Sequence, residues 1–528
     1  MIHDYFPYEE YRTGQHDTLD VLETIIEDNN YEYIILDAPT GYGKSSIAFT
    51  LANYLNDCFD GRSYILTATK QLQSQYLDEV NRLGFKADYK EAMGRSNYQC
   101  KILGDTCDYG RCKTAPATQK FKCPYGLFDG TLAGGCGGCL YWQAKYECAM
   151  SDVAIMNYDV LMVDNLFINH YYDRDLLICD EAHNIEDKLM NHVTISLSDL
   201  ALKKIGVSLE EESFKQYDID YWIDYIRGLI NICNQRENSA NFHGLNIHEL
   251  QRISTFRESL QWKVRELDKH KDYWVINSDE FVRRIEIKPI KVSKYANDLL
   301  LKSGRIKMFM SGSFIDYEQF CHDLGINPDD AYHYRTESGF DMKGHNPIYR
   351  RLAGSMSYKS KAKTLPNTIP ILHSIFNEHE GSKGLIHCNS REFARYIMDN
   401  VHNDRLITYT PKDKEDKLRL FENSSNLIMV SYSMTEGVDL PYDGIRFQVF
   451  YKIPYMSLAD NQVKRRLELE PNWYNVKTMQ TLLQAWGRGM RAADDYCTNY
   501  VIDSSINRIL HDKAFEHLVP DEFREAII

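Results

Sequence analysis

The chain has 528 residues, of which 43% are hydrophobic and 26% are charged, and it carries a formal net charge of -15. Because single hydrophobic cores stop growing near about 250 to 300 residues, this length predicts several domains in a globular protein. No stretch approaches the ~18 uninterrupted apolar residues of a membrane span, and the first residues lack a signal-peptide pattern. We therefore expect a cytoplasmic protein without a membrane partner.

A glutamine and several aromatic residues precede the first predicted strand. Gln15 has an amide that can both donate to and accept from the edge of an adenine, and Phe6, Tyr8 and Tyr11 could stack on such a base. Gln15 is therefore a candidate contact for ATP, although this pattern alone is weak.

A glycine-rich loop at 37–45 follows a short apolar strand at 33–36 and precedes an amphipathic helix. Gly41 and Gly43 let the backbone curl so that N–H groups point inward, and the helix N-terminus adds a partial positive charge. Lys44 can then reach the β and γ phosphates of ATP, while Ser45 offers its hydroxyl to Mg²⁺. The residues of this loop that we expect at the nucleotide are Thr40, Gly41, Gly43, Lys44, Ser45 and Ser46.

Cysteines are concentrated in one segment, since seven of the 13 lie between Cys100 and Cys148. Clustered cysteines in an intracellular chain indicate a metal site or catalysis before disulfides. Only Cys136 and Cys139 have the tight spacing of a chelating pair, and four of the seven thiols would suit zinc as well as an iron–sulfur cluster. The spacing alone leaves both metals open.

A buried strand at 176–179 ends in the sequence Asp-Glu-Ala-His at 180–183. Asp180 can hold Mg²⁺, and Glu181 is placed to orient and deprotonate the attacking water. An acidic turn without a catalytic role is the plainer interpretation, but an upstream phosphate loop favours the catalytic one.

The segment 185–282 has helical periodicity, with one apolar stripe around Trp222 and another around Leu260, and is predicted to be a helical insertion. Eight basic residues and two acidic ones follow between Arg283 and Lys307. They are compatible with a local track for nucleic acid in an acidic protein, although a solvated helix face is the plainer alternative.

A second series of alternating strands and helices begins after a strand at 308–313, with strands expected at 384–388, 427–430, 447–450 and 500–502. This alternation predicts a second parallel α/β domain. It has no phosphate loop, but Arg488 and Arg491 lie three residues apart on a predicted helix. Such a pair can neutralise a γ-phosphate that is bound by another domain.

The phosphate loop at 38–45, the Asp-Glu-Ala-His sequence at 180–183 and Gln-x-x-Gly-Arg-x-x-Arg at 484–491 together resemble the motifs of superfamily 2 helicases. The position of the cysteines between the first two motifs resembles the XPD/DinG family of iron–sulfur DNA helicases over nearly the whole chain. The resemblance implies a RecA-like motor domain at 1–95, 150–184 and 283–325, a second at 326–528, a cluster domain at 96–149 and an Arch-like insertion at 185–282. It also makes Asp439 and Gln484 nucleotide contacts.

The resemblance further implies a 4Fe–4S cluster. Its first ligand follows a Gly-Arg-x-Asn segment and its last precedes an aromatic pair, which correspond to Cys100 and Cys139 here. By order we favour Cys112 and Cys123 as the middle pair and keep Cys107 and Cys136 as substitutes. Cys148 falls in a predicted helix and is expected to be a core thiol. The Mg²⁺ ligands implied are Ser45 and Asp180.

The function implied is that of an ATP-dependent helicase and translocase on single-stranded DNA, moving 5′ to 3′, with the cluster domain as a strand-separating wedge. The expected partners are single-stranded DNA and forked or overhang duplexes, and the expected state is a monomer with a role in DNA repair. One alternative is a DEAH-type RNA helicase, against which the cysteines argue. Another is a zinc-containing ATPase switch that is stimulated by nucleic acid without unwinding it.

Overall fold

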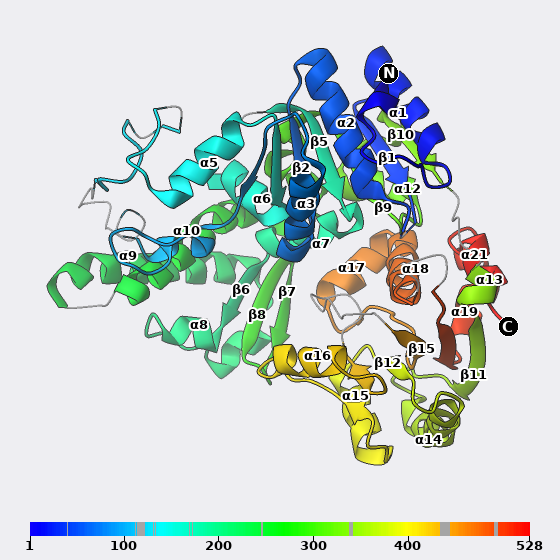
Figure 1. The fold of residues 1–528 in the computed structure, drawn as a ribbon. Coiled ribbons are helices and arrows are strands. Elements are labelled where there is room, and N and C mark those ends of the chain that lie inside the picture. Colours follow the sequence, from blue (N-terminus) through cyan, green and yellow to red (C-terminus); the bar gives the residue numbers. More distant parts are fainter. Residues whose placement is uncertain are drawn as a thin grey trace.

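The structure is a computed structural model of the chain. It describes residues 1–39, 41–110, 112, 122–129, 131–132, 134–167, 169–171, 173–243, 247–336, 342–432, 444–489 and 495–528. Two parallel sheets form two α/β domains, one above the other in Figure 1, and a third, antiparallel sheet lies in the insertion beside them. None of the helices in these ranges has both the length and the apolar character needed to cross a membrane.

The first domain contains a seven-stranded sheet in the order β10-β1-β9-β5-β2-β4-β3, in which every recorded pair is parallel. Its strands are β1 (Tyr33–Asp37), β2 (Ser63–Thr67), β3 (Tyr89–Ala92), β4 (Val153–Asn157), β5 (Arg174–Asp180), β9 (Gly304–Ser311) and β10 (Ala331–Arg335). The helices of this part are α1 (Gln15–Asp28), α2 (Lys44–Phe59), α3 (Lys70–Leu83), α5 (Leu140–Met150), α6 (Tyr158–Phe167), α7 (Ile185–Val193), α11 (Ser293–Leu299) and α12 (Tyr317–Leu324).

The five inner strands are nearly uniform runs of buried residues, as expected when helices cover both faces of a parallel sheet. On one face, Phe49 of α2 packs with Ile34, Leu36 and Ile178 in one cluster of buried side chains. The other face contributes to a second cluster that continues into the insertion through Leu189 and Leu202. The helix that follows the phosphate loop and the insertion therefore pack against opposite faces of the same sheet.

The second domain contains a six-stranded sheet in the order β11-β16-β15-β12-β14-β13, again parallel throughout. Its strands are β11 (Ile348–Gly354), β12 (Lys383–His387), β13 (Leu406–Ile407), β14 (Ile428–Ser431), β15 (Ile445–Phe450) and β16 (Thr498–Asp503). Its helices are α13 (Met342–His345), α14 (Lys361–Glu378), α15 (Arg391–Asn400), α16 (Lys414–Glu422), α17 (Asn461–Leu469), α18 (Pro471–Gly487), α19 (Ile506–His511), α20 (Lys513–Glu516) and α21 (Asp521–Glu525). The two sheets confirm the predicted class of two RecA-like domains.

The insertion is less helical than predicted. Its long helices α9 (Ile219–His243) and α10 (Ile247–Lys269) pack against each other, and Trp222 and Leu260 of the predicted stripes are buried. However, the short helix α8 (Asp199–Lys203) follows a strand, and an antiparallel sheet joins β6 (Ile195–Ser198), β8 (Arg284–Pro289) and β7 (Trp274–Asp279). Strand β8 extends beyond the expected boundary at 282. In the same way, β10 belongs to the first sheet although the expected boundary of that domain was 325.

The cysteine segment occupies the connection between two neighbouring strands of the first sheet. Strand β3 lies at the sheet edge, β4 lies next to it, and the chain between Ala92 and Val153 contains all seven clustered cysteines. Parallel neighbours need a crossover connection in any case. Here α5 returns the chain to β4 and packs on β3.

Candidate active site

The phosphate loop connects β1 to α2 and has the backbone that its glycines predict. Gly41 and Gly43 have φ angles of 81° and 87°, in the left-handed region that glycine adopts freely. A Cβ on Gly43 would also lie 2.5 Å from Nε2 of Gln15. Lys44 is the first residue of α2, and its Nζ donates to the carbonyl oxygens of Ala38 at 3.1 Å and Pro39 at 3.4 Å. The ammonium group therefore lies inside the loop.

Gln15 is buried and bonded to the loop itself. Its Nε2 donates to the carbonyl oxygen of Tyr42 at 2.8 Å and to Oγ of Ser46 at 3.1 Å, while its Oε1 accepts from the backbone N–H of Arg12 at 2.7 Å. The Arg12 guanidinium also donates to the carbonyl oxygen of Gly41. The sequence pointed to an adenine contact, and the structure adds that Gln15 joins the N-terminal segment to the phosphate loop.

Asp180 is the last residue of β5, and Glu181 follows it. Only β9 separates β5 from β1, so both acidic residues lie at the carboxyl ends of the strands, where the phosphate loop leaves β1. Oδ2 of Asp180 accepts from the Tyr76 hydroxyl at 2.8 Å, and Oδ1 accepts from the Glu181 N–H at 2.9 Å. Burial and the Glu181 charge raise the pKa of Asp180 to about 6, against the opposing charge of Lys44. The Asp180 carboxylate is buried, whereas the Glu181 side chain is 38% exposed. The carboxylate of Asp180 and the hydroxyl of Ser45 are oxygen ligands of the kind that Mg²⁺ prefers.

A chain of polar contacts leads from Glu181 to the second domain, and the sequence did not predict its members as a unit. His183 lies 3.3 Å from Oε2 of Glu181, and its Nδ1 lies 2.7 Å from Oγ of Ser311 at the end of β9. That oxygen accepts from the N–H of Ser313 at 3.1 Å, and the Ser313 hydroxyl accepts from Nε2 of Gln484 at 3.3 Å. The small polar residues that end the strand at 308–313 were the only sequence signal for this link.

Arg488 directly follows α18 and faces the same site. Burial lowers the pKa of His183 to about 3, and the positive charges of Lys477, Lys44 and Arg488 add to that effect. The histidine is therefore neutral, and cations from both domains converge on it. Arg491, Thr40 and Asp439 lie outside the described residues.

Five thiols approach one another in the cysteine segment. The Cys107 thiol donates to Cys139, and this bond, with the N–H groups of Trp142 and Tyr141 and against the effect of burial, lowers the pKa of Cys139 to about 6. The Arg95 guanidinium donates to Sγ of Cys107 at 3.7 Å and to Sγ of Cys112 at 4.0 Å. Thiolates that are stabilised in this way suit a metal cluster.

The other cysteines of the segment, Cys100, Cys123 and Cys136, differ in how near their sulfur atoms lie to those of Cys107, Cys112 and Cys139. A Cβ on Gly110 would lie 3.3 Å from Sγ of Cys112 and 3.7 Å from Sγ of Cys100, so these two sulfurs flank one glycine. Burial, with the charges of Cys112 and Cys139, raises the pKa of Cys123. Cys136 instead points to the carbonyl oxygen of Cys139 at 3.9 Å. The geometry thus includes all four expected ligands and adds Cys107. Cys148 is buried, as expected.

Known proteins resemble this chain in sequence and in fold. A family model described as "Helicase C-terminal domain" matches residues 372–524, and one described as "Type III restriction enzyme, res subunit" matches residues 9–217. A protein of Methanocaldococcus jannaschii named "Probable ATP-dependent helicase" is 22% identical to this chain. The alignment is 629 residues long with its gaps and covers 97% of this chain and 95% of that protein.

Solved structures of XPD proteins match the whole molecule. One titled as an XPD helicase has a TM-score of 0.66 at 18% identity and covers 97% of this chain and 99% of its own. The structure of Xpd4 from S. tokodaii has a TM-score of 0.60 at 16% identity and covers 98% and 99% of the two chains. The chain has the fold of these XPD proteins. This confirms the resemblance that the motifs indicated.

In this XPD-like fold, a buried group of charges joins the two domains close to the active site. Arg466 of α17 is fully buried and donates to the carboxylates of Glu186 on α7 and Asp323 on α12. Lys477 of α18 lies 2.8 Å from Oε2 of Glu186, and the Trp473 ring lies 4.2 Å from the Arg466 guanidinium. Glu186 follows the Asp-Glu-Ala-His sequence by three residues, so this network connects the catalytic segment to the second domain.

Several basic residues of the run at 283–307 form ion pairs within this XPD-like molecule. Arg283 pairs with Asp199 at 2.6 Å, Lys288 with Asp460 of the second domain at 3.0 Å, Lys291 with Glu470, and Lys307 with Glu32. Asn277 of β7 also donates to Asp460 at 2.7 Å. Lys288 and Lys291 therefore connect this part of the chain to the second domain, whereas Arg283 and Lys307 pair within the insertion and the first domain. These four side chains are not free for the track that the composition suggested.

Proposed function

We propose that the protein is an ATP-dependent helicase that translocates 5′ to 3′ on single-stranded DNA and unwinds forked or overhang duplexes as a monomer. The observation that carries this proposal is that the charge of Lys44 acts on Asp180, and that Lys44 of the first domain and Arg488 of the second both act on His183. Two α/β domains that complete one ATP site between them can convert hydrolysis into relative motion.

Each residue of the site has a proposed role in hydrolysis. Lys44 leaves the carbonyl oxygens of its loop to bind the β and γ phosphates, where the N–H groups around Gly41 and Gly43 also donate. Ser45 and Asp180 would hold Mg²⁺, which supplies charge neutralisation at the phosphates. Glu181 orients and deprotonates the attacking water.

Residues of both flanks complete the proposed nucleotide site. Arg488 and Arg491 of the second domain neutralise the charge of the transition state. Gln484 of the same domain donates to Ser313 and so couples the position of that domain to the site. Gln15 and Ser46 hold the loop in place. The assignments of Thr40 and Asp439 rest on the motif resemblance alone.

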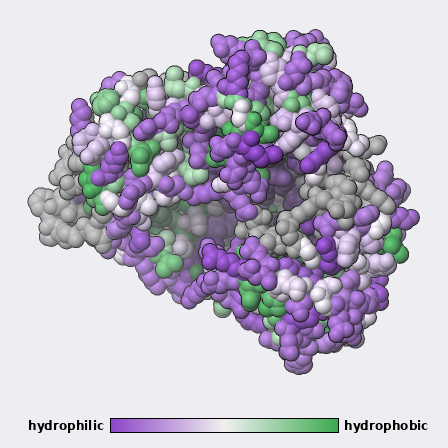
Figure 2. Space-filling model, in the orientation of Figure 1, coloured by the Kyte–Doolittle hydropathy of each residue, from purple (hydrophilic) through white to green (hydrophobic). Residues whose placement is uncertain are grey.

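The cysteine segment is proposed to hold a 4Fe–4S cluster through Cys100, Cys112, Cys123 and Cys139. Cys107 is the strongest substitute, because it is buried and bonded to Cys139. The cluster would supply rigidity rather than redox chemistry, so that the segment between β3 and β4 can act as a wedge. The face in Figure 2 is largely hydrophilic and is hollowed near its middle, between the insertion and the two motor domains, and we propose that the strand passes there.

A strand-displacement assay tests the proposal with matched substrates. ATP should drive unwinding of a DNA duplex with a 5′ overhang, and Lys44→Ala should abolish it while retaining single-strand binding. Lys86→Ala is the control, because that side chain is 88% exposed and pairs only with surface groups. Faster displacement of an RNA duplex would favour the DEAH-type RNA helicase, and ATP hydrolysis without displacement of either duplex would favour an ATPase switch.

A further inference from the structure

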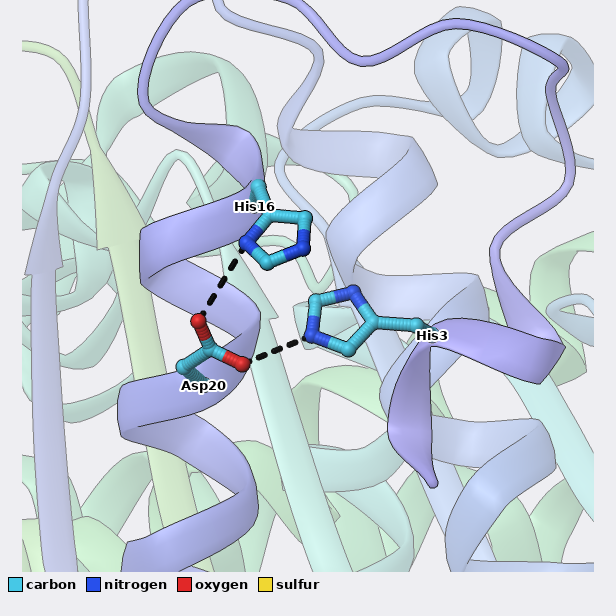
Figure 3. A group of neighbouring side chains, drawn as sticks. All are labelled: His3, His16 and Asp20. Atoms are coloured by element: carbon cyan, nitrogen blue, oxygen red, sulfur yellow. Dashed lines mark hydrogen bonds and ion pairs between the residues drawn. The ribbon is translucent and has the colours of Figure 1, made fainter.

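Two histidines and an aspartate, none of them proposed to act in hydrolysis, converge on the surface of the first domain. His3 lies in the 3₁₀ helix Ile2–Tyr5, and His16 and Asp20 lie one turn apart at the start of α1. Nε2 of His3 lies 2.7 Å from Oδ1 of Asp20, and Nδ1 of His16 lies 3.2 Å from Oδ2. Figure 3 shows both rings directed at this one carboxylate.

We propose that His3, His16 and Asp20 form a binding site for one divalent transition-metal ion of the zinc type. Their three ligand atoms all lie within 4.8 Å of one another, so a single ion can reach them with small side-chain movements. Two imidazoles and one carboxylate are a usual three-ligand set for zinc, whose bonds to nitrogen and oxygen are about 2.0 to 2.2 Å long. The same ligands also suit other late divalent ions.

The exposure of the three side chains fits an ion that arrives from solvent. The side chain of His16 is 57% exposed and that of Asp20 is 54% exposed, whereas that of His3 is 15% exposed. An ion can bind first to His3, after which the side chains of His16 and Asp20 can move to coordinate it. Water can fill the remaining coordination position.

The His3 imidazole also has a hydrogen-bond partner, Tyr11, which determines the ring nitrogen that is available to a metal. Nδ1 of His3 lies 3.1 Å from the Tyr11 hydroxyl, and the Tyr11 ring stacks on Phe6 with centroids 4.3 Å apart. A hydroxyl oxygen can accept from Nδ1–H, which leaves the lone pair of Nε2 free for a metal. Histidine ligands in metal sites usually have a hydrogen-bond partner of this kind on the second nitrogen.

The two imidazole rings are stacked, with centroids 4.1 Å apart and an interplanar angle of 21°. Each ring has one nitrogen near the Asp20 carboxylate, so one ion can approach both nitrogens and a carboxylate oxygen. A metal ion binds imidazoles in their neutral form, so their stacking in such a site carries no charge repulsion.

Metal binding would tie the ends of the segment that precedes the phosphate loop. The loop between His3 and His16 carries Arg12, which bonds to Gln15 and to the Gly41 carbonyl oxygen. An ion that fixes both ends of this loop would order Arg12 against the phosphate loop. We therefore expect the ion to lower the KM for ATP, and this consequence alone rests on the proposed function.

The test is a Co²⁺ titration of the cluster-loaded 528-residue protein, followed by absorption spectroscopy. Cobalt bound by nitrogen and oxygen ligands shows weak d–d bands, whereas cobalt bound by cysteines adds intense sulfur charge-transfer bands, so the two kinds of site are distinguished. We expect one equivalent with nitrogen and oxygen ligands that Zn²⁺ displaces. His16→Ala and Asp20→Asn should abolish it, and Tyr11→Phe should weaken it about 10- to 100-fold.

The matched control is His402→Ala, which removes an exposed histidine from the second domain. It should bind Co²⁺ as the unchanged protein does. Equal binding by the His16→Ala variant, or the absence of a nitrogen-ligated equivalent in the unchanged protein, would overturn the proposal. Because this readout needs no ATP, it stands even if the protein fails to hydrolyse ATP, whereas an unchanged KM would refute only the coupling to the phosphate loop.

Discussion

Replacing Arg466 by alanine tests whether the buried charge network holds the two motor domains together. The guanidinium is fully buried and donates to Glu186 and Asp323, which come from the other domain. Lys477 still compensates Glu186 in the variant, but Asp323 loses its direct cationic partner. Breaking a buried ion pair by removing one partner costs about 3 to 5 kcal/mol. At about 1.4 kcal/mol per tenfold, the docked-to-undocked ratio should fall by a factor of roughly 10² to 10³·⁵.

Calorimetry measures this loss against a control on the same helix. For domains of this size, each kcal/mol lowers the melting temperature by about 2 to 4 °C, so Arg466→Ala should melt about 6 to 20 °C lower. The neighbouring Arg465 is 52% exposed and pairs with Glu468 at 2.8 Å. A surface pair contributes about 0 to 1 kcal/mol, so Arg465→Ala should lose at most about 4 °C. If the two variants melted alike, the network would not be what holds the domains together.

The pH dependence of the same variant provides an independent check. Burial and the Glu186 charge raise the pKa of Asp323 well above its ordinary range, and Arg466 opposes this rise. Without Arg466 the folded-state pKa rises further above the unfolded value of about 3.9, so the folded protein binds more protons than the unfolded chain. Stability then falls as the pH rises through the folded-state pKa. The deficit of Arg466→Ala should therefore be smaller at pH 5 than at pH 8, and a deficit that grew on acidification would contradict the argument.

Three further predictions concern the proposed helicase. Arg488→Ala should bind ATP nearly normally but hydrolyse it about 10³- to 10⁵-fold more slowly in single-turnover assays, and an equal loss of affinity would make Arg488 a binding group. Tyr76→Phe removes the hydroxyl bonded to Asp180 and should further raise the pKa of that carboxyl, so that the acidic limb of the hydrolysis profile moves to higher pH. Cys139→Ser should remove the visible absorption of the cluster and abolish unwinding while part of the ATP hydrolysis survives, whereas Cys148→Ser should leave both cluster and unwinding intact.

The sequence predicts the central strands of both sheets because they are buried on two faces. The runs at 33–36 and 176–179 are continuously apolar and correspond to β1 and β5. Edge strands lack that signal: β10 contains alternating tyrosine, histidine and arginine and is only partly buried, so its membership in the first sheet could not be read from composition. The sheet in the insertion was missed for a related reason. In β8, the buried Ile285 and Ile287 alternate with charged residues that we counted as a basic run.

The phosphate loop and the acidic pair were predictable because each is a local sequence with a local function. The contacts between distant segments were not, because the sequence does not show which residues meet. Gln484 reaches Ser313 across the domain boundary, and Cys107 reaches Cys139 across the cysteine segment. Arg466 ends the run Lys-Arg-Arg at 464–466 and looks like a surface residue until Glu186 and Asp323 are found beside it.

Because the cysteine segment lies between β3 and β4 at one side of the first sheet, its length can change without a change in the order of the strands. The two strands are parallel neighbours, β3 lies at the edge of the first sheet, and α5 packs on both of them. Most of the segment ahead of α5 could therefore be shortened, exchanged or acquired without rearranging the strand order of the motor. Gene-level insertions and deletions at this edge are expected to be tolerated by folding, so the motor and the cysteine module can evolve at different rates.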